Sequence, residues 1–278
     1  MATGLKALLV AAGVGSRLRP LTDVLPKCLM PINGQPLLGL WLERVAAAGT
    51  TDIVVNLHHH AALVRAYVER SPYAGAVVLS PEETLLGTAG TLMRHRDQLS
   101  GAPILFAHAD NLSVFDLERF LEAHKARPSG ALVTMMTFTA ETPELCGIVT
   151  LDARGRIASF DEKPRQPKGN MANAAVFLID PELFGVIDAF GRLVFEFSTD
   201  VLPHILDRVH TFHNDVYHRD IGTLPSLCRA QLDYFCLERG RDPARVAQDP
   251  WYGMMTENGG RLAQDFARAV EAAFRAAG

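Results

Sequence analysis

Strands and helices alternate through the first 110 residues, and this alternation restricts the possible folds more than any other feature of the sequence. Apolar runs without polar alternation, which are typical of strands buried on both faces of a sheet, fall at 6–12, 52–57, 76–80 and 103–110. Helical patterns separate these runs, at 36–48, 60–70 and about 90–99. This order predicts an α/β fold in which a mostly parallel sheet carries helices on both faces.

The pattern changes after the fourth expected strand. We expect a helix at 114–126, a strand at 130–138 and, at 147–163, a hairpin that turns at Ala153-Arg154-Gly155. The elements expected after it are a strand at 172–180, a helix at 181–190, a strand followed by a loop at 210–223, and a helix at 224–238. A chain of 278 residues suits one large domain with an appendage. We therefore expect a main domain at 1–238 and a tail at 239–278.

The tail is predicted to be helical. Its apolar residues recur every four positions and share one face, and they are Leu262, Phe266, Val270 and Phe274. We expect this face to pack on the body of the protein or on a second subunit, which allows a homo-oligomer. The polar face is not strongly basic, which disfavours a membrane partner.

Composition excludes several classes of protein. The formal net charge is −4, whereas a protein that binds nucleic acid in bulk should be basic. The four cysteines form no CxxC pair, so neither a zinc knuckle nor a redox motif is expected. The apolar run at 7–14 is too short to span a membrane and is followed by no cleavage-site pattern. Scattered cysteines without a signal peptide favour a reducing cytoplasm.

A glycine-bearing loop follows the first expected strand. Gly13 and Gly15 let the backbone approach a ligand closely, and loop N–H groups can hold phosphates. A dinucleotide-binding loop would need a third glycine where Leu18 stands, and a Walker A loop would need a Gly-Lys-Ser/Thr run that is missing here. Arg17 and Lys27 add two cations, which suits a triphosphate. The spacing by itself remains compatible with a phosphate-binding loop and with a structural loop.

Two aspartates and a group of histidines are further candidates. Asp110 ends the fourth expected strand, where it could hold a hard cation or cap the next helix. Asp220 stands before a glycine turn at 221–223 and is expected to be a turn residue unless the fold brings it to Asp110. The histidine run 58–60 favours a polar loop over a metal site, and His108 is a candidate for supporting Asp110.

The glycine loop and later segments resemble the signature of the sugar-1-phosphate nucleotidyltransferases. The matches in the loop stand at fixed spacing, which makes them specific, and they are Gly13, Gly15, Ser16, Arg17, Leu18, Pro20, Leu21, Thr22, Pro26, Lys27, Pro31, Gly34 and Pro36. The resemblance continues at 86–90, Asp110, 162–164, Asn173 and 220–223. It covers about residues 5–235 and does not include the tail.

The resemblance implies a Rossmann-like fold of the GT-A type, with a mixed, mostly parallel sheet and flanking helices. It also implies a reaction in which a nucleoside triphosphate and a sugar 1-phosphate combine with release of pyrophosphate, with Mg²⁺ as cofactor. Arg17 and Lys27 would be catalytic, and Asp110 and Asp220 would bind the metal. The implied nucleotide contacts are Ala12, Gly13, Gly15, Ser16, Glu82, Gly87 and Thr88. The implied sugar-phosphate contacts are Asn111, Gly147, Glu162, Lys163 and Asn173.

These residue types agree with the chemistry of the implied reaction. The attacking oxygen belongs to a phosphate that is already ionised at neutral pH, so the reaction needs no general base. Its difficulty lies in bringing several anionic groups together, which positioning and charge neutralisation can overcome. Arginine, lysine and Mg²⁺ are therefore the expected parts of the site.

The substrates are less constrained than the reaction. The Gly-Thr-Ala-Gly run at 87–90 resembles guanylyltransferases of mannose or manno-heptose 1-phosphate, which serve nucleotide-sugar and polysaccharide biosynthesis. Departures from the family pattern, at Ala109, Tyr217 and 174–177, fall near the implied sugar and metal. The alternatives are a uridylyl- or cytidylyltransferase for another sugar 1-phosphate, such as N-acetylmuramic acid 1-phosphate, and an inactive homologue that senses sugar nucleotides.

Overall fold

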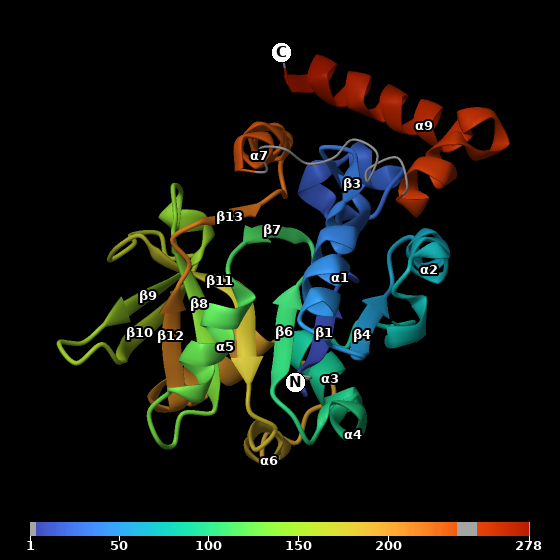
Figure 1. The fold of residues 1–278 in the computed structure, drawn as a ribbon. Coiled ribbons are helices and arrows are strands. Elements are labelled where there is room, and N and C mark those ends of the chain that lie inside the picture. Colours follow the sequence, from blue (N-terminus) through green and yellow to red (C-terminus); the bar gives the residue numbers. More distant parts are fainter. Residues whose placement is uncertain (1–3, 238–248, 278) are drawn as a thin grey trace.

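The computed structural model describes residues 4–237 and 249–277, and a sheet of nine strands forms the centre of this described part (Figure 1). Four neighbouring strands run parallel in the order β6-β1-β4-β5, and they are called the parallel half. Their bounds are β1 Lys6–Val10, β4 Asp52–Leu57, β5 Val77–Pro81 and β6 Ile104–His108. The predicted first four strands are thereby confirmed.

The other strands of the sheet form a mixed half. Strand β11 pairs antiparallel with β6, β8 and β9, while β10 pairs antiparallel with β9, and β12 runs parallel to β8. The bounds are β8 Val133–Thr139, β9 Gly147–Leu151, β10 Ile157–Glu162, β11 Met171–Ile179 and β12 Val209–His213. Strands β9 and β10 form the predicted hairpin, with its turn between Leu151 and Ile157.

Both faces of the sheet are covered, as the unbroken apolar strands require. In β1, Leu9 belongs to one core cluster, with α1, α2, α5, α7 and α9, while Leu8 belongs to the opposite cluster, with α3, α4 and α6. The helices are α1 Leu37–Ala47, α2 Ala61–Arg70, α3 Gly87–Arg94, α4 Arg96–Leu99, α5 Leu117–Lys125, α6 Leu183–Asp188, α7 Leu224–Leu237 and α9 Pro250–Ala277. The predicted α/β class with helices on both faces is confirmed.

Three predicted elements differ from the structure. The helix expected at about 90–99 begins at Gly87, because Phe195 and Glu196 accept the N–H groups of its first turn. It is also divided at His95. The helix expected at 114–126 begins only at Leu117, where Asp116 caps it, and the residues before it form strand β7, Asn111–Val114. The loop expected after 213 contains another strand, β13, Tyr217–Asp220, which pairs with β7.

The tail forms helix α9, whose backbone is non-helical at 257–260. Trp251 and Met254 are buried, and Leu262 is packed against the core, so the tail lies on the body as one of the two predicted arrangements requires. Phe274 does not follow the predicted face, since it is 54% exposed while Ala273 beside it is buried. The predicted boundary at 238/239, and residues 239–248, lie outside the described residues. In the described part, no helix combines the length and apolar character that crossing a membrane requires.

Candidate active site

The glycine loop leaves the carboxyl end of β1 and runs through three short 3-10 turns, at Ser16–Leu18, Leu21–Asp23 and Lys27–Leu29. Gly15 has a φ of 64° and packs so tightly that a Cβ there would lie 2.9 Å from a methyl carbon of Thr22. The Thr22 hydroxyl also donates a hydrogen bond of 3.0 Å to the Gly15 carbonyl. A side chain at this position would therefore strain the backbone and displace Thr22.

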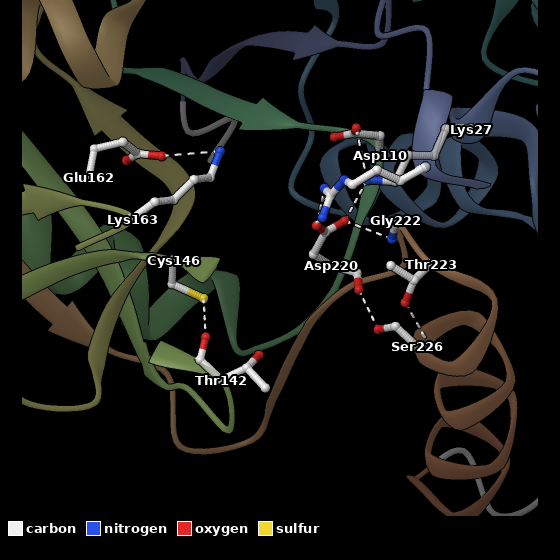
Figure 2. Close-up of polar contacts among 11 residues, drawn as sticks. Lys27, Asp110, Thr142, Cys146, Glu162, Lys163, Asp220, Gly222, Thr223 and Ser226 are labelled. Carbon is white, nitrogen blue, oxygen red and sulfur yellow. Dashed lines mark hydrogen bonds and ion pairs between the residues drawn. The ribbon is translucent and has the colours of Figure 1, made fainter. Parts of the chain in front are cut away.

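Lys27 lies at the centre of a charged cluster. Its Nζ contacts Asp110 Oδ2 at 3.1 Å and Asp220 Oδ1 at 2.5 Å, and its side chain is only 6% exposed. Arg17 Nη2 lies 3.0 Å from the other carboxylate oxygen of Asp220, and the Arg17 side chain is 58% exposed. Figure 2 shows Lys27, Asp110 and Asp220 converging from three separate segments. Two cations and two carboxylates thus share one small volume.

The unexpected strand β13 explains how Asp220 reaches this cluster. It pairs antiparallel with β7, in a register that places Asp220 opposite Asn111, the residue after Asp110. The backbone N–H of Gly222 donates to Asp220 Oδ1 at 2.9 Å, and Ser226 Oγ donates to the Asp220 carbonyl at 2.5 Å. The fold therefore brings the two aspartates to one site. This proximity meets the condition under which we expected Asp220 to be more than a turn residue.

The cluster fixes the charge state of its members. Burial by itself would lower the pKa of Lys27, but Asp110 and Asp220 more than offset it, and the pKa lies above its ordinary value. Burial would raise the pKa of Asp220, but Lys27 and then Arg17 outweigh it, and the pKa lies below its ordinary value. At neutral pH the lysine is therefore protonated and Asp220 is ionised.

The segment 82–90 follows β5 and runs into the first turn of α3. Glu82 is buried, and its carboxylate accepts hydrogen bonds from Asn56 Nδ2 at 3.1 Å, Thr91 Oγ1 at 2.6 Å and the Leu86 N–H at 3.1 Å. Asn56 Oδ1 in turn accepts from the Ala11 N–H at 2.7 Å, next to Ala12. The bonds formed by Glu82 link this loop to β4 and α3 and so hold its shape.

The N-terminus of α3 is covered by the segment 193–197. A Cβ on Gly87 would lie 2.3 Å from the Phe195 carbonyl oxygen, and the N–H groups of Ala89 and Gly90 donate to that oxygen. Thr88 donates from both its N–H and its hydroxyl to Glu196 Oε2, at 3.0 and 2.7 Å. Gly87 and Thr88 therefore stand at a helix start whose donors have partners within the chain.

Four of the five expected sugar contacts lie on or next to β9, β10 and β11. Gly147 lies opposite Glu162 in the β9–β10 pair, and a Cβ on Gly147 would lie 2.7 Å from Glu162 Oε2. Lys163 has a φ of 46°, and its Nζ lies 3.5 Å from Glu162 Oε1 (Figure 2). Asn173 Oδ1 accepts from the Ala175 N–H at 2.9 Å, and its Nδ2 donates to Ser198 Oγ at 3.5 Å.

A cleft of about 660 Å³ opens beside the charged cluster. Arg17 and Asp220 line one side of it, and the 138–146 segment, which ends at Cys146 beside Gly147, lines another. Figure 2 places Thr142 and Cys146 across from Asp220 and Ser226. The fifth expected sugar contact, Asn111, is held by its backbone carbonyl, which accepts from Trp41 Nε1 at 3.0 Å.

Two histidines, His108 and His218, each stand two residues before an aspartate of the cluster. The Nε2 of His108 is buried without a hydrogen-bond partner, and burial lowers the pKa of this side chain. His218 Nδ1 lies 2.6 Å from Ser113 Oγ, and burial lowers the pKa of His218 to about 3. Both rings are therefore neutral at neutral pH.

The donor set of the cluster suits a hard cation. Asp110 and Asp220 supply carboxylate oxygens, the ligands that Mg²⁺ prefers, on either side of Lys27. No group of three or more histidine, cysteine, aspartate or glutamate side chains that could hold a metal occurs within 4–237 and 249–277. Any cation at this site would thus have two protein carboxylates, and phosphates or water would complete its coordination.

The sequence reasoning missed several residues that shape the site. Asn56 links β1 to Glu82, Glu196 caps α3, and Ser226 holds Asp220. Asn56 had a visible signal, because it is the polar residue within the apolar part of a buried strand. Glu196 had none, since its contact with Thr88 joins residues 108 positions apart.

Comparison with known proteins agrees with this geometry. The nucleotidyl transferase family matches residues 6–235 of the chain. Mannose-1-phosphate guanylyltransferase 1 of Arabidopsis thaliana is 30% identical over 190 residues, which are 66% of this chain and 52% of that protein. A probable mannose-1-phosphate guanylyltransferase 2 of the same plant is 29% identical over 257 residues, which are 88% of this chain and 69% of that protein. The chain thus spans about half of the first relative and two thirds of the second.

Solved structures share the fold. A putative glucose-1-phosphate thymidylyltransferase from Bacillus anthracis aligns with a TM-score of 0.72 at 23% identity, over 82% of this chain and 94% of that one. HddC from Yersinia pseudotuberculosis complexed with GMP-PN aligns with a TM-score of 0.68 at 20% identity, over 82% and 99%. At these identities the likeness bears on the fold, and it extends over nearly the whole of both neighbours.

Proposed function

The chain belongs to the nucleotidyl transferase family, and we propose that it transfers a nucleoside monophosphate, most readily from GTP, to a sugar 1-phosphate of the mannose or manno-heptose type. The observation that carries this proposal is the buried Lys27 held between Asp110 and Asp220 beside the exposed Arg17. Such a cluster neutralises the charge that accumulates when two phosphates approach each other.

The two cations have different parts in this scheme. Lys27 is buried and fixed, so it would neutralise the α-phosphate and the attacking sugar phosphate at one position. Arg17 is exposed, and an incoming triphosphate can compete with Asp220 for its guanidinium. Arg17 would then hold the β- and γ-phosphates and stabilise the charge on departing pyrophosphate.

Asp110 and Asp220 would hold Mg²⁺, because two carboxylates that contact the same lysine supply oxygen ligands for a hard cation. When bound, the ion adds positive charge and orients the phosphate oxygens for in-line displacement. The chain itself fixes the carboxylates, through Lys27 and through the Gly222 N–H.

The nucleotide and the sugar would lie on opposite sides of the cluster. Ala12, Gly13, Gly15 and Ser16 would border the triphosphate, while Gly87 and Thr88 would face the base, supported by the buried Glu82. On the other side Lys163 would leave Glu162 to pair with the sugar phosphate, and Asn111, Gly147, Glu162 and Asn173 would contact the sugar. Pairing between Lys163 and Glu162 keeps both charges satisfied until the sugar phosphate binds.

The preference for GTP and a mannose-type sugar rests on the curated relatives, which are mannose-1-phosphate guanylyltransferases. We assign the reaction to a domain at 1–238 that acts on small molecules in the cytoplasm, with 239–278 as a supporting tail. The test is pyrophosphate release with Mg²⁺, using GTP, UTP, CTP, dTTP and ATP against a panel of sugar 1-phosphates.

Release above background with GTP and mannose or manno-heptose 1-phosphate is the expected result. Activity with UTP or CTP and another sugar would support nucleotidyl transfer but would show that both proposed substrates are wrong. A blank panel, together with nucleotide binding that remains detectable by calorimetry, would contradict the transferase and favour a sensing homologue.

A further inference from the structure

The carboxyl end of β4 reaches the glycine loop through two neighbouring histidines. His59 Nε2 lies 2.8 Å from the carbonyl oxygen of Thr22, and His60 Nε2 lies 3.2 Å from the same oxygen. A carbonyl oxygen only accepts, so both imidazoles carry their proton on Nε2 and donate. The two rings also contact each other, with centroids 4.2 Å apart. We call His59, His60 and the Thr22 carbonyl the histidine clasp.

The clasp acts on the part of the loop that bears the catalytic cations. Thr22 donates its hydroxyl to the Gly15 carbonyl, and its methyl carbon packs where a Gly15 side chain would be. Gly15 in turn precedes the turn that carries Arg17, and a Cβ there would also lie 3.2 Å from Lys27 Cβ. Holding the Thr22 carbonyl therefore fixes Gly15, and through Gly15 the positions of Arg17 and Lys27.

The same strand end also holds the loop on the other side of the nucleotide site. His58 Nδ1 donates to the Glu82 carbonyl at 2.8 Å, and Asn56 donates to the Glu82 carboxylate at 3.1 Å. The backbone of His60 has a φ of 50°, which a non-glycine residue adopts only where surrounding contacts impose it. The residues from Asn56 to His60 thus connect two loops that lie far apart in the sequence.

We propose that His59 and His60 are positioning residues, which set the place of the Arg17-bearing loop relative to the base-side loop for binding of the triphosphate. This inference rests on the proposed function for its kinetic consequence, although the clasp itself can be tested without turnover. Residues on β9, β10 and β11 do not contact the clasp through the bonds described above, so binding of the sugar 1-phosphate should not depend on it.

The test compares four proteins. The double variant His59→Ala/His60→Gly removes both donors, and glycine at 60 adopts the positive φ without strain. His59→Gln keeps an N–H donor at 59, and His204→Ala removes an exposed histidine on the opposite face as a matched control. The readouts are kcat, both KM values, the thermal midpoint, and hydrogen exchange of peptides that cover residues 13–25.

In the double variant we expect kcat/KM for MgGTP to fall about 10-fold, since small misplacements of catalytic groups cost this much or more. The KM for the sugar 1-phosphate should change less than about twofold, and exchange at 13–25 should accelerate about 10-fold. His59→Gln should recover most of the kcat/KM, and His204→Ala should match the wild type.

Two results would contradict the proposal that His59 and His60 position the loop. One is unchanged exchange at 13–25 in the double variant, and the other is an equal loss toward both substrates, as general destabilisation would give. If the double variant does not fold, His59→Ala alone replaces it with the same criteria. A wild-type protein that neither binds MgGTP nor releases pyrophosphate would contradict the proposed function, while hydrogen exchange would still decide whether the clasp holds the loop.

Discussion

The parallel and mixed halves of the sheet carry different kinds of site residue. On the parallel half, Lys27 is buried between two carboxylates, and Glu82 accepts three hydrogen bonds within the chain. On the mixed half, Lys163 is 63% exposed and reaches Glu162 only at 3.5 Å, while Asn173 meets Ser198 at 3.5 Å. Lys27 and Glu82 are thus held in place within the chain, whereas Lys163 on the side proposed for the sugar is loosely held.

We infer from this difference that the parallel half supplies the groups for the reaction, whereas the mixed half sets the choice of sugar. A fixed set of charges suits any nucleoside triphosphate, because the triphosphate is common to all of them. Loosely held side chains at the proposed sugar site can be replaced without disturbing the cluster, so one fold can serve several sugars. Of the departures from the family pattern, 174–177 lies on β11 of the mixed half, whereas Ala109 and Tyr217 lie on the segments that carry Asp110 and Asp220.

The largest effect is expected from Lys27→Met, which removes the cation that Asp110 and Asp220 share. We expect kcat to fall by about 10³-fold, because a preorganised charge is lost where phosphate charge accumulates. Steady-state pyrophosphate release measures this, and Arg70→Met, which removes a cation at the exposed Glu257 pair, is the matched control. A loss below about 10-fold in a folded variant would show that the cluster is not the reacting centre.

Sequence reasoning reached the parallel half more completely than the mixed half. The apolar runs of β1, β4, β5 and β6 and the glycine loop are local patterns, and their order along the chain sets the parallel sheet. The approach of Asp220 to Asp110 could be stated only as a condition, because it depends on the pairing of β13 with β7 across more than 100 residues.

Contacts that join distant segments explain the remaining gaps. The four residues of β13, Tyr217–Asp220, are too few for a strand pattern to stand out. The early start of α3 depends on Phe195 and Glu196, which accept hydrogen bonds from the N–H groups of its first turn. No local pattern around Gly87 predicts these contacts. Phe274 follows the helical period of the tail, but the tail helix presents Ala273 to the body instead.

The substitution for which we expect an intermediate effect on activity lies on the mixed half. For Glu162→Gln we expect the KM of the sugar 1-phosphate to rise about 10-fold, since the site loses a charged hydrogen-bond acceptor for sugar hydroxyls. The KM for the nucleotide should stay within about twofold, because no contact described above joins Glu162 to the glycine loop. Full kinetics against both substrates measure this. An equal rise in both KM values would contradict the proposal that the two halves bind the nucleotide and the sugar separately.

The smallest effect concerns stability of the mixed half and comes from His124, a buried residue of α5 whose Nδ1 lies 2.8 Å from Thr134 Oγ1 on β8. Burial, followed by the charge of Arg127, lowers the pKa of His124 from 6.5 to about 4. The folded state therefore binds this proton less readily than the unfolded chain does. The stability is fully present above pH 6.5 and is lost as the pH falls from 6.5 toward 4.

Replacing His124 by glutamine removes this titration while keeping a polar group that can bond Thr134. Between pH 7 and 5.5 we expect the wild type to lose about 1 kcal/mol more unfolding free energy than His124→Gln, a factor of about five in the unfolding equilibrium. Urea unfolding of both proteins at the two pH values measures the difference, and the other histidines cancel because both chains carry them. Parallel pH dependences would mean that His124 takes up its proton equally in the folded and unfolded states, and that α5 opens to water more readily than its packing on β8 indicates.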